Sequence, residues 1–419
     1  MEIGILTVGN ELTSGRTQDA NSSMIARAMQ EQGWPVARMM SVGDNAGEIR
    51  DALDYLLLHA AAVVVTGGLG PTADDITTEA VARAFGLSLR MDEAVLAHVR
   101  GLFEKRRLPW TENNAKQALF PEGAEIIANP GGTAAGFALR QSGKVIAVIP
   151  GVPGEARTML AEGVVPLLRA AFTEAVLHVE TATFKLFGIS EAAVDAAMAD
   201  ADLAALGVEI GFYPHFPENH VVLTARETSA EAAGEKLREG GARVVTRLGK
   251  HLFARDGETL EGNIARWMTE RRLTMAVAES CTGGLIADRL TNIPGSSAFF
   301  ERGIVCYSNA AKTSLLGVPE ETIRERGAVS AETARLMAEG VRRIAATDLG
   351  LAVTGIAGPS GGTEEKPVGT VHIALSDGET TLCRQHALRW DRRRNKIAAS
   401  QAALLLLQRC LKGEIRDDG

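Results

Sequence analysis

Ser280 and Cys281, two possible nucleophiles, stand side by side in the segment AESCTGGLIA, residues 278–287. The apolar residues before them predict a strand, and those after them predict a helix that begins at Gly283 with Thr282 as its cap. Ser280 would then lie on the connecting turn, near backbone N–H groups that could hold an oxyanion. A plain turn, in which the hydroxyl residues only cap the helix, fits the pattern at least as well.

A nucleophilic serine needs a base, and GIVCYSNAAKT, residues 303–313, offers a lysine. GIVCY predicts a strand, and Ser308 or Asn309 is expected to cap the next helix, with Lys312 in its first turn. The positive end of the helix dipole and burial would both favour the neutral amine of Lys312. Tyr307 could relay the proton or hold the serine hydroxyl, although most isolated lysines are simply surface residues.

Two histidines are rival bases, His372 in TVHIAL and His386 in RQHALRW. A pair of Cys281 with either histidine would also supply a nucleophile, because thiolates are intrinsically reactive. No spacing selects a histidine, so this pair ranks below Ser280. The four cysteines form no C-x-x-C pair, and reduced, mostly buried thiols are expected.

A glycine-rich loop, VTGIAGPSGGTEEKPVGTV at residues 353–371, follows the apolar strand LGLAVTG. Its place beyond a strand end favours a ligand cradle over a flexible connection. The candidate substrate contacts within it are Thr354, Gly355 and Gly358. The charge run RWDRRRNK opens the last helix, and such a run is most often a solvated face. We choose Arg392 from it as the residue that meets a substrate phosphate.

In the first part of the chain, GGLGPTADD, residues 67–75, stands between the apolar run AAVVVT and a helix. Glycines let the backbone approach a ligand, and amides at a helix N-terminus hold anions. Asp74 and Asp75 could bind a divalent cation through their carboxylate oxygens. A turn with an aspartate as N-cap is the alternative, and spacing alone does not decide between the two.

Three further segments favour a ligand site: GNEL at 9–12, NPGG at 129–132 and GVPGE at 151–155, which ends in Glu155. GNEL and GVPGE follow apolar strands, and NPGG precedes TAAGFAL. In an open parallel sheet, ligands bind beyond the carboxyl ends of the strands. The sequence therefore predicts a nucleotide-phosphate and metal site where these loops meet.

The elements that must position these residues fall into three parts, residues 1–170, 171–253 and 254–419. Strands and helices alternate in the first and last parts, which predicts two doubly wound α/β domains with parallel sheets. The middle part predicts a small α+β (KH-like) module, a spacer or dimerisation unit, because it has no G-x-x-G loop with basic residues.

We expect Asn21 to cap the first helix and Gly33 to end it. The expected strands are 1–8, 35–43, 61–68 and 144–151, then 181–188, 220–227 and 250–257, then 273–278, 303–309, 349–355 and 367–376. The expected helices are 21–33, 46–60, 77–86 and 154–172, then 190–201 and 229–248, then 259–272, 335–348 and 396–411.

Composition limits the class of protein. The chain has 419 residues, of which 46% are hydrophobic and 23% charged, and its net charge of −8 argues against nucleic-acid binding. No run approaches the ~18 apolar residues of a membrane span, and the start lacks the basic and apolar regions of a signal peptide. A cytoplasmic protein that contacts no membrane is expected. No histidine pair has zinc spacing.

The motifs GNEL, DANSSMIA, GGLGPTADD, NPGGTAAGF and GVPGE resemble the molybdopterin-binding-like domain of the CinA family, the competence/damage-inducible proteins. The resemblance implies a doubly wound fold shared with molybdenum-cofactor biosynthesis proteins and metal-dependent hydrolysis of ADP-ribose, with AMP and ribose 5-phosphate as the expected products. It makes Asp74, Asp75 and Glu155 the candidate ligands of a divalent metal. The other residues assigned to this pocket are Asn10, Glu11, Gly67, Gly68, Gly70 and Thr72. Two departures concern the detail of the pocket: TSG follows GNEL, and Ala135 stands where proline is common.

AESCTGG, YSNAAKTSLLGV, GAVS, the glycine-rich loop and the last helix resemble the CinA C-terminal domain, which also occurs alone as nicotinamide-nucleotide amidohydrolase. The resemblance implies hydrolysis of the carboxamide of nicotinamide mononucleotide to nicotinate mononucleotide and ammonia. It puts the nucleophile on Ser280, with Tyr307 and Lys312 as partners. Backbone amides near Thr282 and Gly283 would hold the oxyanion, and this domain would need no cofactor.

The first hypothesis is therefore a homodimeric, bifunctional enzyme of pyridine-nucleotide recycling, whose partners are these two small nucleotides. One alternative is a nucleotide-binding protein that serves a competence partner and has one active site or none. The other is a molybdopterin-binding protein, which only the fold of the first domain suggests.

Overall fold

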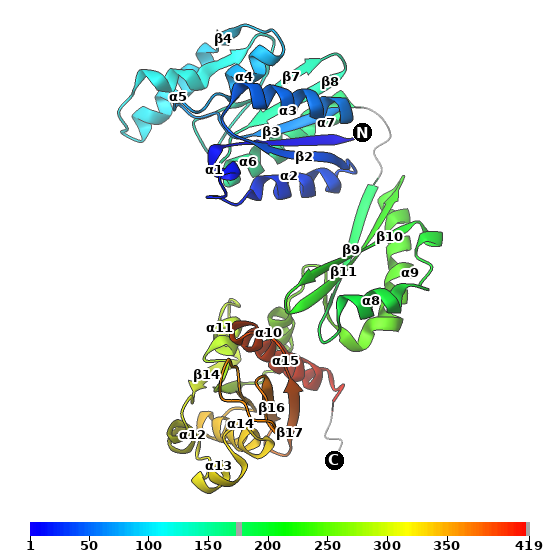
Figure 1. The fold of residues 1–419 in the computed structure, drawn as a ribbon, viewed down its shortest axis with the longest axis vertical. Helices are drawn as coiled ribbons and strands as arrows, with labels where there is room; N and C mark the ends of the chain where they lie inside the picture. Colours follow the sequence, from blue (N-terminus) through cyan, green and yellow to red (C-terminus); the bar gives the residue numbers. More distant parts are fainter. Residues whose placement is uncertain (173–177, 416–419) are drawn as a thin grey trace. The chain divides into compact units, whose positions relative to one another are not determined.

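The computed structural model describes residues 1–172 and 178–415, in which three larger sheets and one two-stranded antiparallel sheet, Leu89–Met91 with Leu119–Pro121, are formed (Figure 1). Each of the three larger sheets carries its own helices. Two are α/β sheets, and the third is a small antiparallel sheet between them in the sequence. This is the predicted fold class. Across the described ranges, no helix is both long and apolar enough to cross a bilayer.

The first sheet has the strand order β2-β1-β3-β8-β7-β6. Its strands are β1 (Ile3–Val8), β2 (Val36–Val42), β3 (Ala62–Thr66), β6 (Glu125–Ile127), β7 (Gly136–Gln141) and β8 (Lys144–Ile149). The first four in that order are parallel, whereas β7 and β6 pair antiparallel, so the predicted all-parallel sheet is wrong at this edge. The cause is the two-residue turn Ser142-Gly143, in which both residues have positive φ, as in a tight hairpin.

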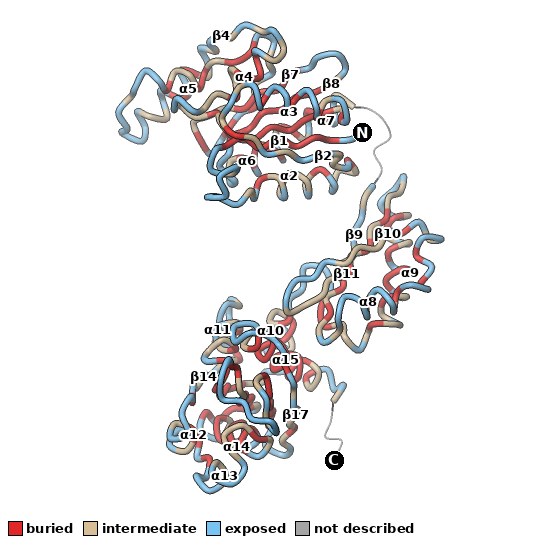
Figure 2. Tube along the Cα trace, in the orientation of Figure 1, coloured by how far each residue is buried: buried red, intermediate tan, exposed pale blue. Residues whose placement is uncertain are grey.

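Helices cover both faces of this sheet because its strands alternate apolar residues between two cores. Ile3 and Ile5 face one core and Leu6 and Val8 the other. The first core is closed by α2 (Ala20–Glu31), α6 (Pro153–Met159) and α7 (Val165–Ala171), and the second by α3 (Ala46–His59) and α4 (Thr77–Ala84). Figure 2 shows β1 buried along its length, whereas the edge strand β2 is only partly buried. The smaller elements are α1 (Asn10–Thr13), β4 (Leu89–Met91), α5 (Glu93–Lys105), η1 (Glu112–Ala118), β5 (Leu119–Pro121) and η2 (Leu160–Val164).

The middle module is a four-stranded sheet of order β10-β11-β9-β12 with two helices. Its elements are β9 (His178–Leu186), α8 (Glu191–Met198), η3 (Ala204–Leu206), β10 (Val208–His215), β11 (Glu218–Glu227), α9 (Ala230–Leu248), η4 (Gly249–His251) and β12 (Leu252–Arg255). The sequence did not predict β10, because VEIGFYPH contains a glycine and a proline and is largely exposed, so it lacks the apolar alternation of a strand.

The last sheet has the order β14-β13-β15-β16-β17. Its strands are β13 (Met275–Glu279), β14 (Phe300–Val305), β15 (Leu349–Gly355), β16 (Thr370–Ser376) and β17 (Thr381–Ala387). The first three are parallel, and β16 and β17 are antiparallel, so the predicted parallel sheet is again mixed. One face carries α10 (Leu260–Glu270), α11 (Leu285–Thr291) and α15 (Arg392–Lys412), and the other α12 (Asn309–Leu316), α13 (Glu320–Arg326) and α14 (Ala331–Ala345). The short η5 spans Ser296–Ala298.

Candidate active sites

Ser280 lies on the turn directly after β13, beyond the carboxyl end of the strand. Its amide donates to the carbonyl of Val353 on the neighbouring strand (3.0 Å), which ties the turn to the sheet. The helix that follows begins only at Leu285, after Gly283 (φ +63) and Gly284 (φ +96) have reversed the chain. The predicted cap at Thr282 is therefore wrong: this side chain is buried, and its hydroxyl bonds to no described residue.

Lys312 is the partner of Ser280. Ser308 caps α12, as predicted, by accepting a hydrogen bond from the Ala311 amide, and Lys312 lies in the first turn. The Lys312 side chain is only 1% exposed, and its Nζ lies 3.0 Å from Ser280 Oγ. It also lies 3.0 Å from the carbonyl oxygen of Cys306 and 3.3 Å from that of Tyr307. Burial lowers the pKa of Lys312, which favours the neutral amine.

The side chain of Tyr307 points away from this pair. It is 58% exposed, and its hydroxyl accepts a hydrogen bond from Arg392 (2.7 Å). The same guanidinium donates to the carbonyl of Gly358 in the glycine-rich loop (2.7 Å). Arg392 thus joins the end of β14 to the loop, and the backbone carbonyl of Tyr307, not its hydroxyl, contacts Lys312.

The glycine-rich loop lies beside Ser280 through its first residues. The Thr354 hydroxyl donates to the Ala328 carbonyl (2.7 Å). Gly355 packs so closely on Cys281 that a Cβ there would lie 3.1 Å from the sulfur. Both predicted contacts therefore lie at the edge of the site, but the Thr354 hydroxyl is already used within the fold.

Cys281 has the surroundings of a packed core residue. Burial raises the pKa of its thiol to about 12, so the thiol is protonated at neutral pH. No hydrogen bond in the described ranges joins it to His372 or His386, and burial lowers the pKa of both histidines. The rival cysteine–histidine pair has no geometric support.

Lys396 is a cation at this site that the sequence analysis missed. It lies one helical turn after Arg392 on α15, half-buried. Its Nζ lies 3.5 Å from the point that a Cβ on Gly283 would occupy. Within residues 1–172 and 178–415 it has neither a hydrogen bond nor an ion pair. The i, i+4 spacing from Arg392 was the available signal, because it places both side chains on one face of the helix.

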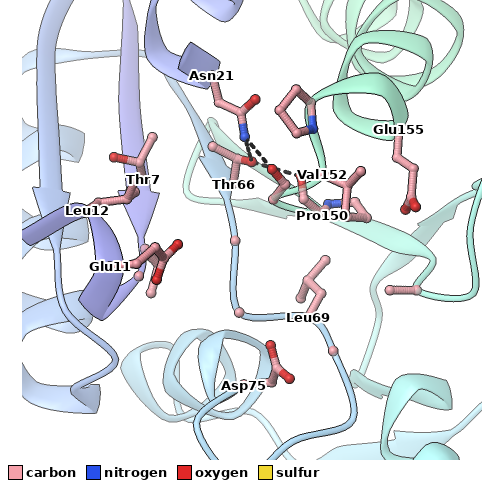
Figure 3. A pocket seen from close by; sticks show the side chains of 18 of the residues that line it. Thr7, Glu11, Leu12, Asn21, Thr66, Leu69, Asp75, Pro150, Val152 and Glu155 are labelled. Atoms are coloured by element: carbon pink, nitrogen blue, oxygen red, sulfur yellow. Dashed lines mark hydrogen bonds between the residues drawn. The ribbon is translucent and has the colours of Figure 1, made fainter. Parts of the chain in front are cut away.

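The first domain has a cavity of about 610 Å³ at the carboxyl ends of β1, β3 and β8 (Figure 3). Seven of the predicted residues line it: Glu11, Gly67, Gly68, Gly70, Asp74, Asp75 and Glu155. Asn10 and Thr72 do not line the cavity, but each forms a hydrogen bond to a residue that does. The Asn10 amide donates to Asp44 Oδ2 (2.9 Å) and its side-chain oxygen accepts from the Asp44 amide (3.1 Å), while Thr72 donates to the carboxylate of Asp75.

Close packing within the fold requires glycine at positions 67 and 68, where the loop after β3 lines the cavity. Gly67 has φ +108, and a Cβ on it would lie 2.2 Å from the carbonyl oxygen of Val8. Gly68 has φ +65, and a Cβ there would lie 2.2 Å from Thr77 Oγ1. Only glycine fits both positions. The helix behind them, α4, has no side-chain cap, so neither aspartate of the motif caps it.

The floor of the cavity is a hydrogen-bonded group around the buried Asn21 and Thr66 (Figure 3). Asn21 donates to Thr66 Oγ1 (3.2 Å) and to the Gly151 carbonyl (2.8 Å), and so joins α2 to β3 and the loop after β8. The predicted N-cap role of Asn21 is wrong, because Asp19 caps α2 by accepting from the Ser22 amide. Gly33 (φ +78) follows the end of that helix, as predicted.

The charged side chains among the described residues that line this cavity are all carboxylates. They are Glu11, Asp19, Asp44, Asp74, Asp75 and Glu155, and no described lysine or arginine is part of the lining. Burial raises the pKa of Asp44, and the negative charges of Glu11, Asp74 and Asp75 raise it further. Asp44 follows β2 and was not predicted, because a single aspartate in a GDN turn is ordinary turn chemistry.

The carboxylates suit a divalent cation in chemical type, because such ions prefer oxygen ligands. Among residues 1–172 and 178–415, however, no three His, Cys, Asp or Glu side chains form a group that could hold a metal. Glu155 lies on a different wall from Asp75 (Figure 3), where Asn129 donates to it (2.7 Å). Glu11, Asp74 and Asp75 all act electrostatically on Asp44, so these four carboxylates lie near one another in the cavity.

Three family models match successive parts of the chain. They are a probable molybdopterin binding domain at residues 4–170, the damage-inducible protein CinA KH domain at 181–254, and the CinA C-terminal domain at 257–411. A CinA-like protein of Syntrophus aciditrophicus is 63% identical over 98% of both chains, and one of Geobacter metallireducens is 44% identical over 98% of this chain and 99% of its own. The crystal structure of competence/damage inducible protein CihA from Agrobacterium tumefaciens is 43% identical and covers 36% of this chain and 93% of that chain, with a TM-score of 0.36. The family models and the CinA-like relatives agree with the resemblance in the motifs, and the chain belongs to the CinA family.

Proposed function

We propose that the C-terminal domain is a serine–lysine amidohydrolase that converts nicotinamide mononucleotide and water to nicotinate mononucleotide and ammonia. The observation that carries the proposal is the 3.0 Å contact between a fully buried Lys312 amine and Ser280 Oγ. A buried lysine beside a hydroxyl is a recognised way to activate a nucleophile without a histidine. The family resemblance supplies the substrate.

In the proposed reaction, Lys312 takes the proton of Ser280, and Oγ attacks the carboxamide carbon. The amides of Thr282 and Gly283 stabilise the oxyanion that forms. Lys312 then gives the proton to the departing nitrogen, ammonia leaves, and water hydrolyses the ester to release the acid and free Ser280. Tyr307 acts through its carbonyl, which orients the amine, and through the bond from Arg392.

Lys396 supports a substrate that carries a phosphate. Its Nζ lies next to Gly283 and has no hydrogen-bond or ion-pair partner among residues 1–172 and 178–415, whereas Arg392 already holds Tyr307 and Gly358. We therefore replace Arg392 with Lys396 as the residue that meets the phosphate of the nucleotide. An ammonium group binds phosphate as a point charge, so this contact would set affinity more than the rate of the chemical step.

The test is ammonia release from nicotinamide mononucleotide by the full chain, with and without a chelator. Wild type should release ammonia in both conditions, Ser280→Ala should release none, and the exposed Ser297→Ala should match wild type. Full turnover by Ser280→Ala would exclude the proposed nucleophile. Loss of turnover in Cys281→Ala with retention in Ser280→Ala would favour the thiol.

For the N-terminal domain, the proposed reaction is hydrolysis of ADP-ribose to AMP and ribose 5-phosphate with a divalent cation. The supporting observation is a cavity with six lining carboxylates and no described basic side chain, which would repel a pyrophosphate unless cations came with it. A bound cation would neutralise the pyrophosphate and the leaving oxygen. Glu11, Asp44, Asp74 and Asp75 would hold it, and Asn10 would hold Asp44 in place.

AMP formation from ADP-ribose, measured with magnesium, manganese and cobalt in turn, tests this second activity. Product with at least one metal and none with chelator is expected. No AMP with any metal would make this a binding domain, and no ammonia as well would favour the nucleotide-binding partner of a competence system. We also propose a homodimer, which light scattering of the full chain would test.

A further inference from the structure

Glu279, the residue before Ser280, is a buried carboxylate at the end of β13 with an exposure of 1%. Three backbone amides donate to it: Gly284 (3.0 Å) and Ile286 (3.1 Å) to one oxygen, and Ala287 (2.9 Å) to the other. A carboxylate at the start of a helix is favourable because the free N–H groups and the helix dipole both attract it. Here the Glu279 side chain spans the turn that follows it in the sequence, and its hydrogen bonds connect the end of β13 to the start of α11.

The hydrogen bonds to Glu279 determine which backbone amides remain free near Ser280. The amides of Gly284, Ile286 and Ala287 already donate to Glu279, so they cannot hold an oxyanion. Those of Cys281, Thr282 and Gly283 donate to no acceptor in the described parts of the chain. Gly283 and Gly284 both have positive φ, and successive N–H groups in such a turn form an anion-binding concavity.

We infer that Glu279 is a positioning residue for the Ser280 site. Its two oxygens hold the start of α11, and this contact, together with the bond from the Ser280 amide to Val353, fixes both ends of the turn. The free amides of the turn are then aimed without reorganisation when charge develops on the substrate. Glu279 does not touch the substrate, because it is buried and both oxygens have partners.

A second observation links Glu279 to the lysine. The Cys306 amide donates to the Glu279 carbonyl (2.9 Å), and the Cys306 carbonyl in turn accepts from Lys312. The backbone carbonyl of Glu279 therefore helps to position Lys312 through Cys306, and its side chain positions the turn after Ser280. Both reactive groups depend on one residue at the end of a central strand, which lies between β14 and β15.

The experiment compares wild type with Glu279→Gln, Glu279→Asp and Asp288→Asn in the full chain. Glutamine presents an N–H₂ to a backbone donor, and aspartate keeps the charge but is too short to span all three amides. Asp288 is an exposed carboxylate on the same helix and serves as the control. The readouts are kcat and KM for nicotinamide mononucleotide, the rate at which a fluorophosphonate labels Ser280, and the thermal unfolding midpoint.

We expect kcat and the labelling rate per folded molecule to fall about 10- to 100-fold in both Glu279 variants, with KM within about twofold of wild type. Asp288→Asn should match wild type in all readouts. A Glu279 variant that keeps kcat, or that loses activity only in proportion to its unfolded fraction, overturns the inference. If Glu279→Gln does not fold, Glu279→Asp decides by the same criteria.

The inference rests on the proposed serine chemistry, and the two can fail separately. If wild type labels at Ser280 but releases no ammonia, the proposed substrate is wrong, and the labelling rates of the variants still test Glu279. If wild type does not label at Ser280 and still releases ammonia, both the nucleophile and the positioning role are overturned.

Discussion

At the Ser280 hydroxyl, the partners of the Lys312 amine favour the direction of proton transfer that we propose. Two of its three neighbours, the carbonyls of Cys306 and Tyr307, can only accept hydrogen bonds. A neutral amine has two N–H bonds, which these carbonyls occupy, and one lone pair, which then faces Ser280 Oγ. Burial lowers the pKa of Lys312, and these partners orient its amine as the proposed reaction requires.

The first prediction concerns pH. Because burial lowers the pKa of Lys312, kcat/KM should rise with pH through that lowered pKa and reach its plateau below the ordinary lysine value of about 10.4. Lys312→Met should reduce kcat by about 10²- to 10⁴-fold, and Lys412→Met, at the far end of α15, should not. Ammonia release measured from pH 6 to 10 checks both; a rate independent of pH would contradict the base assignment.

The same group makes a prediction about stability. The folded chain releases the Lys312 proton at a lower pH than the unfolded chain, so between the lowered pKa and about 10.4 the unfolded state binds more protons. The contribution of Lys312 to the free energy of unfolding therefore rises with pH across this window. Below the lowered pKa, burial of the charged amine destabilises the folded state by its full amount. Urea unfolding at several pH values should show this slope in wild type and a smaller one in Lys312→Met.

Lys396 leads to a prediction about substrate choice. If its ammonium meets the phosphate, Lys396→Met should raise KM for nicotinamide mononucleotide by about tenfold or more, because a charge-assisted contact to an anion is lost. Nicotinamide riboside, which lacks the phosphate, should be cleaved equally by wild type and variant. A variant that weakens both substrates alike would show that Lys396 supports the turn at Gly283 instead.

At the scale of the elements, α15 connects three parts of the C-terminal site. Arg392 holds the end of β14 and the glycine-rich loop, and Lys396 reaches the turn after β13. Asn395, on the buried side of the same helix turn, donates to the Ala357 carbonyl (3.1 Å). The first turn of one helix thus places the loop relative to the strands, so its charge run is not simply a solvated face.

Arg392→Ala should therefore loosen the loop. We expect KM for nicotinamide mononucleotide to rise more than kcat falls, because the Ser280–Lys312 contact does not depend on Arg392. Faster hydrogen exchange in residues 356–362 should accompany the change. The neighbouring, exposed Arg393→Ala is the matched control and should leave both readouts unchanged.

The sequence predicted the elements better than their pairing. Parallel strands such as β3 and β15 are continuous apolar runs and were found, whereas β6, β7, β10 and β17 were missed because they are short, partly exposed or joined by tight turns. Ser280 and Lys312, 32 residues apart, were paired because a nucleophilic serine needs a base and because of the resemblance. Glu279, Asp44 and Lys396 were not found, because only the closed turns and the packed helix show what their side chains contact.

At the scale of the whole molecule, the two candidate sites belong to separate sheets, each with its own hydrophobic cores. One site has a lysine and backbone amides and needs no metal in the proposed chemistry. The other has carboxylates, and the reaction proposed there uses a divalent cation to neutralise the pyrophosphate. Because only one of the two proposed reactions uses a metal, a chelator or a substitution in one site should affect one activity and leave the other unchanged.

The last prediction uses this difference. Ser280→Ala should abolish ammonia release and keep AMP formation, whereas Asp44→Asn should lower AMP formation about tenfold or more and keep ammonia release, because it removes a charge from the set that would hold the cation. Asn keeps the acceptor for the Asn10 amide, so the loop itself should stay in place. Asp51→Asn, an exposed carboxylate on α3, is the control for charge. Loss of ammonia release on chelation, or a fall of both activities in either variant, would show that the two sites are not independent.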